Sequence, residues 1–456
     1  MTGKVLICKL KNIQEIPGAD QIVQANLFGE TVIISKDHKE GELGLLFDCE
    51  TQLSPEFCYN NNLYRHSDLN KDKSKTGYIE DNRRVRPIRL RGVRCSGLWM
   101  PLESLLFIHS GYFSKEEIRE GVELDQLGGV AICNKYITQK TKQGRENKQG
   151  KARVNLCPTF KEHIDTDQLM RNLHNIHEGD LITITEKLHG TSCRCGNLPV
   201  LRQKNVFERV LNKIGLNTPD TQYKFVVGSR RVVKSIGDTE HTGPGFYESD
   251  LWTKAAKENF EGKLRKGESI YFEIVGYTPE GTPIMGSHSN EKLKKFMDKV
   301  EYGQFVERYG EQTVFSYGCT PFALQNQPQY DIYVYRITMT NEDGESIDYS
   351  WNQVKTRCEQ LGVKHVPDIE QFVVMNWQLT MASEGQLIDF SLETHLQKLT
   401  DQDSEIFKQH LKEGIVVRVD NGGSIPLFYK NKAYLFKVLE GIIKDTDVVD
   451  LEEVQS

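Results

Sequence analysis

The sequence predicts an α+β protein in which a small β-barrel precedes a larger domain of antiparallel sheets with flanking helices. Three observations support this fold class. Short alternating apolar segments, broken by turn residues, fill the chain up to about Leu127. After Val154, strand-like and helix-like segments alternate without a regular β-α-β rhythm. The chain of 456 residues is also too long for one ordinary hydrophobic core, which favours two domains.

The N-terminal segments have the spacing of strands in an OB-like barrel. Strand patterns cover residues 4–10, 21–27, 30–36 and 43–49, and a second strand pair covers 84–101. Residues 16–20 place Pro and Gly where a tight turn needs them. Because small barrels of this kind often bind single strands or oligonucleotides, we expect an OB-like module, residues 1–140, that is a candidate RNA-binding element.

Five arginines accompany the second strand pair. They mostly flank apolar residues, so they would either contact nucleic acid or hydrate one face of a sheet, and the pattern does not separate these readings. The arginines are Arg84, Arg86, Arg89, Arg91 and Arg94.

A polar and basic segment, residues 138–153, separates the two parts of the chain. It contains glycines and no apolar periodicity, which predicts a flexible linker or exposed loop whose lysines are mainly hydrated. We therefore expect the second domain to span residues 154–456. Its predicted strands cover residues 181–188, 224–233, 269–277, 330–339, 414–420 and 433–440, and its predicted helices cover 352–362 and 392–411.

Composition limits the possible functions. The formal net charge is -6, so any site for a polyanion must be built from local clusters of Lys and Arg. No apolar run is long enough for a membrane span, and the ten cysteines lie mostly in apolar segments, as in reduced proteins. Cys193 and Cys195 lack a second pair at zinc-like spacing. We expect a soluble, monomeric, intracellular protein, cytoplasmic or nuclear, without membrane contact.

The segment from Thr185 to Ser192 carries the strongest chemical signal. An alternating strand ends at Lys187, and Gly190 follows where the backbone can turn tightly beside a ligand. A lysine amine at such a place becomes a nucleophile when burial or neighbouring cations lower its pKa. The pattern K-x-x-G alone is weak, because it occurs by chance in many proteins.

Further charged and aromatic residues follow in a fixed order and strengthen this signal. Carboxylates within apolar strands are costly unless they are paired or bind a metal, so the set predicts a nucleotide-metal site. The residues are Arg230, Arg231, Glu273, Tyr335, Glu413, Lys430, Lys432 and Lys437.

This ordered set resembles the motifs of the covalent nucleotidyltransferase superfamily. The sequence E-K-x-H-G-T at residues 186–191 resembles ATP-dependent RNA ligases more than DNA ligases, which usually carry Asp where His189 stands. The layout is similar to the RNA ligases that place an OB-like module before the catalytic domain. Too few residues follow Lys437 for the C-terminal OB domain of capping enzymes and DNA ligases, which favours the same class.

The resemblance implies a catalytic role for three lysines. Lys187 would attack the α-phosphate of ATP and hold AMP, while Lys430 and Lys432 would neutralise charge on that phosphate. Lys437 is an alternative for the last of these motifs.

The resemblance also implies a nucleotide and metal site. Glu186 would read the adenine beside the turn at Gly190, and Tyr335 would stack on the base. Arg230, or Arg231 in its place, would bind the ribose or an RNA 5'-phosphate. Glu273 would contact the ribose hydroxyls, and Glu273 and Glu413 would orient Mg²⁺ or Mn²⁺, since such cations take few carboxylates and keep their waters.

The function expected from these motifs is ATP-dependent joining of RNA 3'-hydroxyl and 5'-phosphate ends through lysyl-AMP and RNA-adenylate intermediates. A nicked duplex is one candidate substrate. The alternative, from another class, is a non-catalytic RNA-binding protein on a decayed ligase scaffold.

Overall fold

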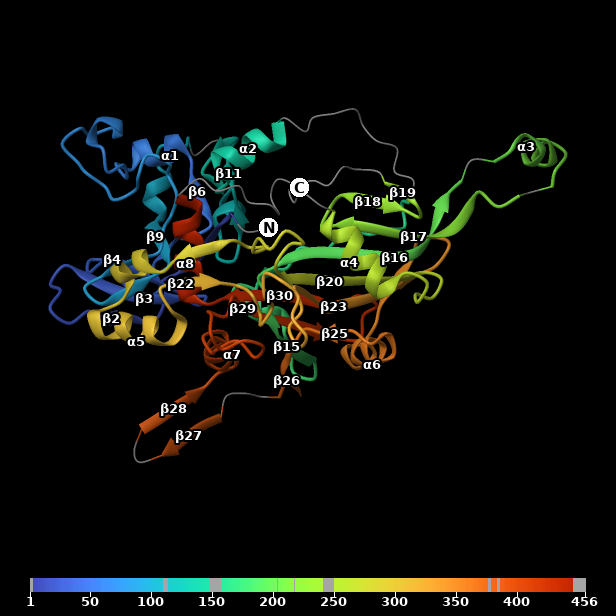
Figure 1. The fold of residues 1–456 in the computed structure, drawn as a ribbon. Helices are drawn as coiled ribbons and strands as arrows, with labels where there is room; N and C mark the ends of the chain where they lie inside the picture. Colours follow the sequence, from blue (N-terminus) through green and yellow to red (C-terminus); the bar gives the residue numbers. More distant parts are fainter. Residues whose placement is uncertain are drawn as a thin grey trace.

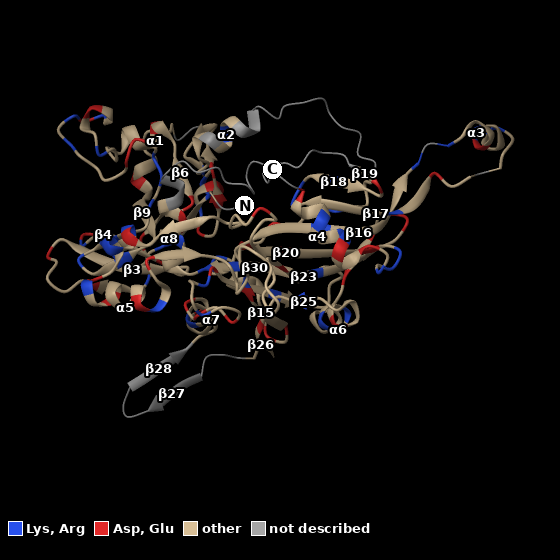
Figure 2. Ribbon diagram, in the orientation of Figure 1, with Lys and Arg blue, Asp and Glu red and all other residues tan. Residues whose placement is uncertain are grey.

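The computed structural model describes residues 3–109, 114–146, 157–202, 204–216, 218–240, 250–375, 379–383 and 386–445. These residues form a mixed α+β fold dominated by antiparallel sheets, which confirms the predicted class (Figure 1). Acidic and basic residues are mixed along the coloured parts of the ribbon, in keeping with the small net charge (Figure 2). No helix among the described residues has the length and apolar character needed to cross a bilayer.

The N-terminal strands curve into a barrel-like unit. One sheet has the order β10-β1-β5-β9 and a second has the order β2-β3-β4. The backbone N–H of Ser96 donates to the carbonyl oxygen of Thr31 over 3.0 Å, which links the two sheets between β4 and the start of β9. The strands are β1 (Val5–Lys9), β2 (Ile13–Glu15), β3 (Ile22–Leu27), β4 (Glu30–Ser35), β5 (Leu43–Asp48), β9 (Gly97–Pro101) and β10 (Glu123–Leu124).

Alternating side chains of these strands fill the inside of the unit. We call this unit, together with the short elements that accompany it up to Lys135, the N-terminal barrel. Leu6, Cys8, Val23, Val32 and Trp99 are buried together there, as the period-two pattern of the sequence predicts. A second apolar cluster contains Val5, Ile7, Leu45 and Phe47 of β1 and β5, and it packs against several, but not all, of the remaining short elements. The remaining short elements are β6 (Thr51–Leu53), α1 (Pro55–Asn60), η1 (Ser67–Leu69), β7 (Ile88–Leu90), β8 (Val93–Cys95), η2 (Leu102–Leu105), η4 (Lys115–Ile118), β11 (Gln126–Leu127), β12 (Val130–Ala131) and β13 (Cys133–Lys135).

Three of the five arginines in residues 84–94 contact residues of the C-terminal region. Arg84 is 3% exposed and donates from Nη1 to the carbonyl oxygen of Gly441 at 2.8 Å. Arg89 and Arg94 lie 3.5 and 3.3 Å from the carboxylate of Glu301. Buried Arg84 and partly buried Arg89 therefore hold the N-terminal barrel against the rest of the chain, because guanidinium groups removed from water need such partners, and exposed Arg94 adds a further contact.

The predicted linker is partly helical. Helix α2 (Gln139–Glu146) occupies its first half, and residues 147–156 lie outside the described part of the chain. The boundary between 140 and 154 therefore stays a prediction.

Two sheets form the centre of the C-terminal region. The larger has the order β19-β18-β17-β16-β20-β23-β24, with β25 pairing to β23. Helices α4 and α6 pack on it over a large apolar cluster. Its elements are β16 (Thr191–Leu201), β17 (Thr221–Ser229), β18 (Val233–Ile236), β19 (Thr239–Glu240), α4 (Leu251–Phe260), β20 (Glu268–Gly276), β23 (Tyr330–Thr340), β24 (Ser346–Asp348), α6 (Trp351–Leu361) and β25 (Lys364–His365).

The smaller sheet has the order β14-β30-β29-β15-β26 and is followed by helix α8. Helix α7 packs on its apolar face. The chain passes from this sheet to the larger one at residues 188–190, between β15 and β16, so the two sheets meet beside the predicted nucleophile. The elements are β14 (Asp167–Gln168), β15 (Leu181–Lys187), β26 (Asp368–Val373), α7 (Leu392–Thr400), β29 (Gly414–Asp420), β30 (Leu427–Lys432) and α8 (Tyr434–Asp445).

An arm extends from the larger sheet. The hairpin of β16 and β17 carries helix α3 (Val206–Lys213) at its tip, away from the rest of the ribbon (Figure 1). The remaining elements are η5 (Leu173–Asn175), β21 (Ser287–Ser289), η6 (Glu291–Phe296), α5 (Lys299–Tyr309), β22 (Gln312–Val314), β27 (Leu379–Ser383) and β28 (Gln386–Phe390).

Three sequence-based assignments are wrong. Of the predicted strand 433–440, residues 434–440 form the start of helix α8, because a short apolar run does not distinguish helix from strand. The predicted strand at 224–233 is divided between β17 and β18 by a turn at residues 230–232. The predicted helix from Leu392 ends at Thr400, where Asp401 caps it.

Candidate active site

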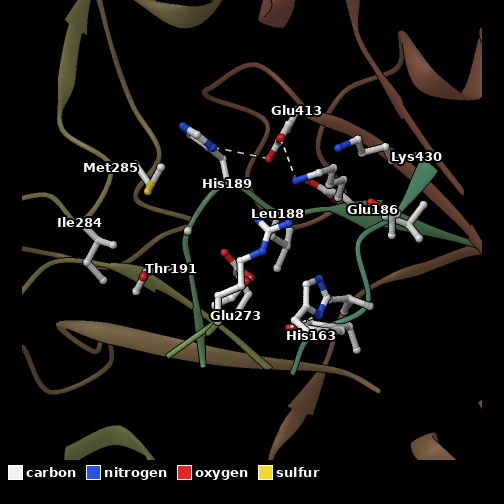
Figure 3. Close-up of a pocket in the computed structure, with 18 of the residues that line it drawn as sticks. His163, Glu186, Leu188, His189, Thr191, Glu273, Ile284, Met285, Glu413 and Lys430 are labelled. Atoms are coloured by element: carbon white, nitrogen blue, oxygen red, sulfur yellow. Dashed lines mark hydrogen bonds and ion pairs between the residues drawn. The ribbon is translucent and has the colours of Figure 1, made fainter. Parts of the chain in front are cut away.

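A large cavity lies where the two sheets meet. Its volume is about 620 Å³, and residues from both sheets and from the N-terminal barrel line it. Figure 3 shows its interior, with Glu413, His189 and Lys430 on one side and Glu273 and His163 on another. Of the site residues predicted from the sequence, all line this cavity except Arg231 and the alternative Lys437.

The register of three strands brings the three lysines that are predicted to be catalytic onto one face. Lys187 pairs with Gly414 across β15 and β29, and Gly414 pairs with Lys432 across β29 and β30. One step along, Lys430 pairs with Val416. Since paired residues of adjacent strands point to the same side of a sheet, the K-x-K spacing directs both later lysines toward the side of Lys187.

Gly414 makes this close arrangement possible. Its φ is +154°, and an added Cβ would lie only 2.0 Å from the carbonyl oxygen of Asn431. No larger residue fits between Lys187 and Lys432 at this position.

Lys187 is held by a buried carboxylate. Its Nζ lies 2.8 Å from Oε1 of Glu413, which is 3% exposed. Burial alone would raise the pKa of Glu413, but the charge of Lys187 and the hydrogen bond of His189 lower it to about 2. The ion pair stabilises the protonated amine, so Lys187 must leave this partner and lose a proton before it can act as a nucleophile.

The turn after Lys187 is fixed by aromatic contacts. The backbone N–H of His189 donates to the hydroxyl of Tyr317 at 2.7 Å. The imidazole packs edge-on against Phe315 and Phe436, with centroids 4.7 and 4.9 Å away, and its Nδ1 lies 3.5 Å from Oε2 of Glu413. At Gly190 a Cβ would meet the carbonyl oxygen of Ile274 at 2.4 Å. The backbone therefore passes between the sheets only with glycine at this position.

Glu186 lies beside the nucleophile but is oriented differently. In β15 it alternates with Lys187, and its Oε2 accepts a hydrogen bond from the backbone N–H of Glu405 at 2.7 Å. Burial raises the pKa of this carboxyl, and its Oε1 has no hydrogen-bond partner among the described residues. Glu186 lines the cavity, and its remaining acceptor oxygen is available to a ligand, so the adenine contact stays a prediction.

The larger sheet supplies Glu273 and Tyr335. Glu273 pairs with Ser192 across β20 and β16, and the Ser192 hydroxyl donates to its Oε2 at 3.0 Å. Tyr335 is the extra residue of a β-bulge, because Tyr271 pairs with Arg336 and Phe272 with Val334. Bulges reorient a side chain locally, which accounts for an aromatic residue of this strand lining the cavity.

The two arginines after β17 share one carboxylate. Nη2 of Arg230 lies 2.7 Å from Oδ1 of Asp165, and Nη2 of Arg231 lies 3.2 Å from Oδ2. Arg230 lines the cavity. This difference favours Arg230 over Arg231 as the phosphate or ribose ligand.

Sequence reasoning missed the segment that carries Asp165. Residues 163, 164 and 166 line the cavity, and the Tyr335 hydroxyl lies 3.2 Å from Nδ1 of His163. Buried Arg194 anchors the segment by donating to the carbonyl oxygens of Phe160 and Ser229, each at 3.1 Å. The local sequence pattern does not predict these contacts. An arginine within an apolar strand, such as Arg194, is nevertheless a sign that another backbone segment supplies its hydrogen-bond acceptors.

Two more arginines line the cavity and were also missed. Arg336 binds Asp348 through Nε and Nη2, at 2.6 and 2.8 Å, and Arg418 binds Asp420. Both guanidinium groups flank the ring of Phe428. Each has a buried Nη1 without a hydrogen-bond partner among the described residues, so each keeps a donor for a ligand or water.

Glu273 and Glu413 are the predicted metal ligands. Both line the cavity, and no group of three or more His, Cys, Asp or Glu that could hold a metal occurs in the described residues. A preformed cage of protein ligands is therefore not part of this site. One or two carboxylates completed by water and phosphate oxygens are the arrangement that suits Mg²⁺.

One of the comparisons with known proteins shows the family. The sequence model of the RNA ligase family matches residues 180–439, more than half of the chain. No curated protein matches.

Among solved structures, a Naegleria gruberi RNA ligase variant with ATP and Mn is similar, with 17% identity, a TM-score of 0.52, and coverage of 96% of this chain and 98% of that one. A second variant of that ligase with ATP and Mn has 17% identity, a TM-score of 0.51, and coverage of 95% and 98%. A variant with AMP and Mn has 15% identity, a TM-score of 0.51, and coverage of 95% and 97%. These likenesses concern the fold. The family match over the catalytic motifs is what assigns the class, and the chain belongs to the RNA ligase family.

Proposed function

We propose that this chain is an ATP-dependent RNA ligase that joins 3'-hydroxyl and 5'-phosphate ends through a lysyl-AMP on Lys187. The observation that carries the proposal is the shared face of three strands on which Lys187, Lys430 and Lys432 line one cavity beside Glu413. A lysine nucleophile beside cations that can neutralise a phosphate is the combination that nucleotidyl transfer requires.

In the first step, the amine of Lys187 leaves Glu413, loses a proton and attacks the α-phosphorus of ATP. A P–N bond forms, the bond from the α-phosphorus to the bridging oxygen breaks, and pyrophosphate leaves with the electron pair. Lys430 and Lys432 would stabilise the charge that builds on the phosphate oxygens. ATP as the donor is supported by the ATP complexes of the Naegleria gruberi ligase variants.

The nucleotide would lie between the two sheets. Tyr335 would stack on the base, and Glu273, already held by Ser192, would accept hydrogen bonds from the ribose hydroxyls. Arg230 would exchange Asp165 for a phosphate or the ribose.

A divalent cation fits the carboxylates of this cavity. Oε2 of Glu413 is buried and its nearest charged partner, Nδ1 of His189, lies 3.5 Å away, so it retains capacity for a cation or its waters. When bound, Mg²⁺ or Mn²⁺ would withdraw charge from the phosphate and replace Lys187 as the partner of Glu413, with Glu273 as the second carboxylate.

Two further transfers complete the proposed reaction. The RNA 5'-phosphate attacks the phosphorus of lysyl-AMP, so that a P–O bond forms, the P–N bond breaks and Lys187 recovers a proton. The 3'-hydroxyl then attacks the adenylated phosphate, loses its proton and displaces AMP. We assign these chemical steps to residues 154–456, and we propose that the N-terminal barrel, residues 1–140, contributes to RNA binding through its OB-like form.

The competing function is RNA binding on a decayed ligase scaffold. Decay would be expected to remove some of the charged residues, whereas Lys187, Glu273, Glu413, Lys430 and Lys432 all line one cavity. This completeness favours the enzyme.

Incubation with α-labelled ATP and Mg²⁺ or Mn²⁺, followed by denaturing electrophoresis, tests the proposal. We expect a covalent label in the wild type and in Lys408→Ala, whose exposed lysine lies outside the cavity, and none in Lys187→Ala. The absence of label in wild-type protein free of bound AMP would contradict the enzyme and favour the RNA-binding alternative.

A further inference from the structure

The N-terminal barrel reaches into the cavity of the proposed ligase. Glu50, in the turn between β5 and β6, and Lys135, at the end of β13, both line the cavity together with Lys430 and Lys432. The cavity is therefore not built by the C-terminal region alone.

Glu50 contacts one of the proposed catalytic lysines directly. Nζ of Lys432 lies 3.1 Å from Oε1 of Glu50 and 2.8 Å from Oε2 of Glu440. The side chains of Lys432, Glu50 and Glu440 are 14%, 16% and 22% exposed, so solvent screens these charges only weakly. Lys432 is held between one carboxylate from the barrel and one from helix α8.

The turn that presents Glu50 is itself fixed. The backbone N–H of Glu50 donates to Oδ1 of Asp48 at 3.0 Å, and its carbonyl oxygen accepts from the N–H of Tyr136 at 2.9 Å. Oδ2 of Asp48 binds Arg171, a residue of the C-terminal region, at 3.2 Å. A hydrogen-bonded chain thus connects the body of the C-terminal region, through the barrel turn, back to Lys432.

The charges of the cavity explain why such a carboxylate is needed. The positive charges of several cavity lysines repel one another. This repulsion affects the pKa of Lys430, which lies near Lys135, Lys187 and Lys432. Burial lowers that pKa, the other three lysines lower it further, and Glu50 is the strongest charge acting in the opposite direction. At Lys432, burial would lower the pKa, but Glu440 and Glu50 raise it well above the ordinary lysine value. Without Glu50, mutual repulsion would displace flexible lysine side chains from their positions.

We propose that Glu50 is a positioning residue for lysine adenylylation, which orients Lys432 toward the α-phosphate of ATP and makes the N-terminal barrel part of the nucleotide site. This inference rests on the proposed function and deepens it, because it assigns the barrel to the first chemical step rather than to RNA binding alone.

A second barrel carboxylate provides a matched control. Glu30 is 3% exposed and binds Lys437 of helix α8, so it also joins the barrel to the C-terminal region, but neither Glu30 nor Lys437 lines the cavity. Glu30→Gln and Glu50→Gln each remove one buried charge from the same interface. They differ in whether the lysine partner faces the cavity.

The test measures the single-turnover rate of enzyme–AMP formation over a range of ATP concentrations for the wild type, Glu50→Gln, Glu50→Asp and Glu30→Gln. Thermal unfolding is followed in parallel. We expect Glu50→Gln to lower the maximal rate about 10-fold to 100-fold with less change in the ATP concentration for half-maximal rate, as for a misplaced catalytic group. Glu50→Asp should recover part of the rate, and Glu30→Gln should lose stability without this loss of rate.

Three outcomes would overturn the inference. A wild-type rate in Glu50→Gln, or equal losses in Glu50→Gln and Glu30→Gln that follow their loss of stability, would assign Glu50 a purely structural role. A wild type that forms no covalent AMP would overturn the proposed function and, with it, this inference, so the two failures are distinguishable.

Discussion

Lys187 and Glu413 form a buried ion pair 2.8 Å long at the centre of the cavity. Glu413 also lies 3.5 Å from the imidazole of His189, so one carboxylate organises both polar side chains of the K-x-H-G turn. The pair keeps the proposed nucleophile protonated until a cation or a phosphate takes over one of the partners. Predictions about the site follow from this relationship.

Glu413 should contribute to stability in a pH-dependent way. Its folded pKa of about 2 lies below the ordinary value of 4.5, so its stabilising contribution is present above about pH 4.5 and is lost as the pH falls toward 2. Glu413→Gln should therefore be less stable than the wild type near neutral pH, on the order of 3 kcal/mol, with a difference that shrinks in acid. Urea unfolding of both proteins at pH 7 and pH 3 measures this. A difference that is the same at both pH values would show that the ion pair does not set this carboxyl's pKa.

Gly190 and Gly414 should not tolerate a side chain. An added Cβ would meet backbone atoms at 2.4 and 2.0 Å, so Gly190→Ala and Gly414→Ala should each destabilise the fold by about 1–3 kcal/mol and abolish labelling with ATP. Gly303, in helix α5, has no atom within 4 Å of such a Cβ. Gly303→Ala should leave labelling intact and raise stability slightly, since alanine favours helices. Labelling that survives at Gly190→Ala would contradict the close passage of the chain between the sheets.

The ring of Tyr335 should matter more than its hydroxyl. The hydroxyl contacts His163, whereas the proposed stacking uses the face of the ring. Tyr335→Ala should weaken ATP binding by about 5-fold to 150-fold, the range for loss of one base-stacking contact of 1–3 kcal/mol. Tyr335→Phe should change it less than about 3-fold, well below the lower end of that range. Equal effects of the two substitutions on the ATP dependence of labelling would exclude stacking as its role.

Arg230 and Arg231 offer a matched pair, because both bind Asp165 and only Arg230 is among the residues that line the cavity. Arg230→Ala should slow ligation at least about 10-fold through loss of a charge-assisted contact, whereas Arg231→Ala should change it little. Steady-state ligation of 5'-phosphorylated RNA distinguishes them. A larger loss in Arg231→Ala would reverse the assignment.

The grouping of the three proposed catalytic lysines was predictable because their positions depend on local rules. Lys187 ends an alternating strand, and the spacing of Lys430 and Lys432 directs both to one side of β30, so sequence pattern alone groups them. The same reasoning left Lys437 as an alternative. The structure separates it from the group because residues 434–440 are helical and direct Lys437 to Glu30, outside the cavity.

The missing parts of the site come from contacts that are distant in sequence. Asp165 reaches Arg230 across 65 positions, and Glu50 reaches Lys432 across 382. Neither carboxylate lies in a motif, and each acquires its role only through the packing of one part of the chain against another. For the same reason the arginines near residue 89, which a single sequence reads as a surface feature, serve to hold the N-terminal barrel.

The most direct test of the central claim locates the AMP on the chain. The wild-type protein, first freed of bound AMP, is incubated with ATP and Mg²⁺ or Mn²⁺, digested with a protease and analysed by mass spectrometry. The account predicts AMP in phosphoramide linkage on Lys187. AMP on Lys430, on Lys432 or on any other residue, or an unmodified peptide containing Lys187 as the sole product, would contradict it.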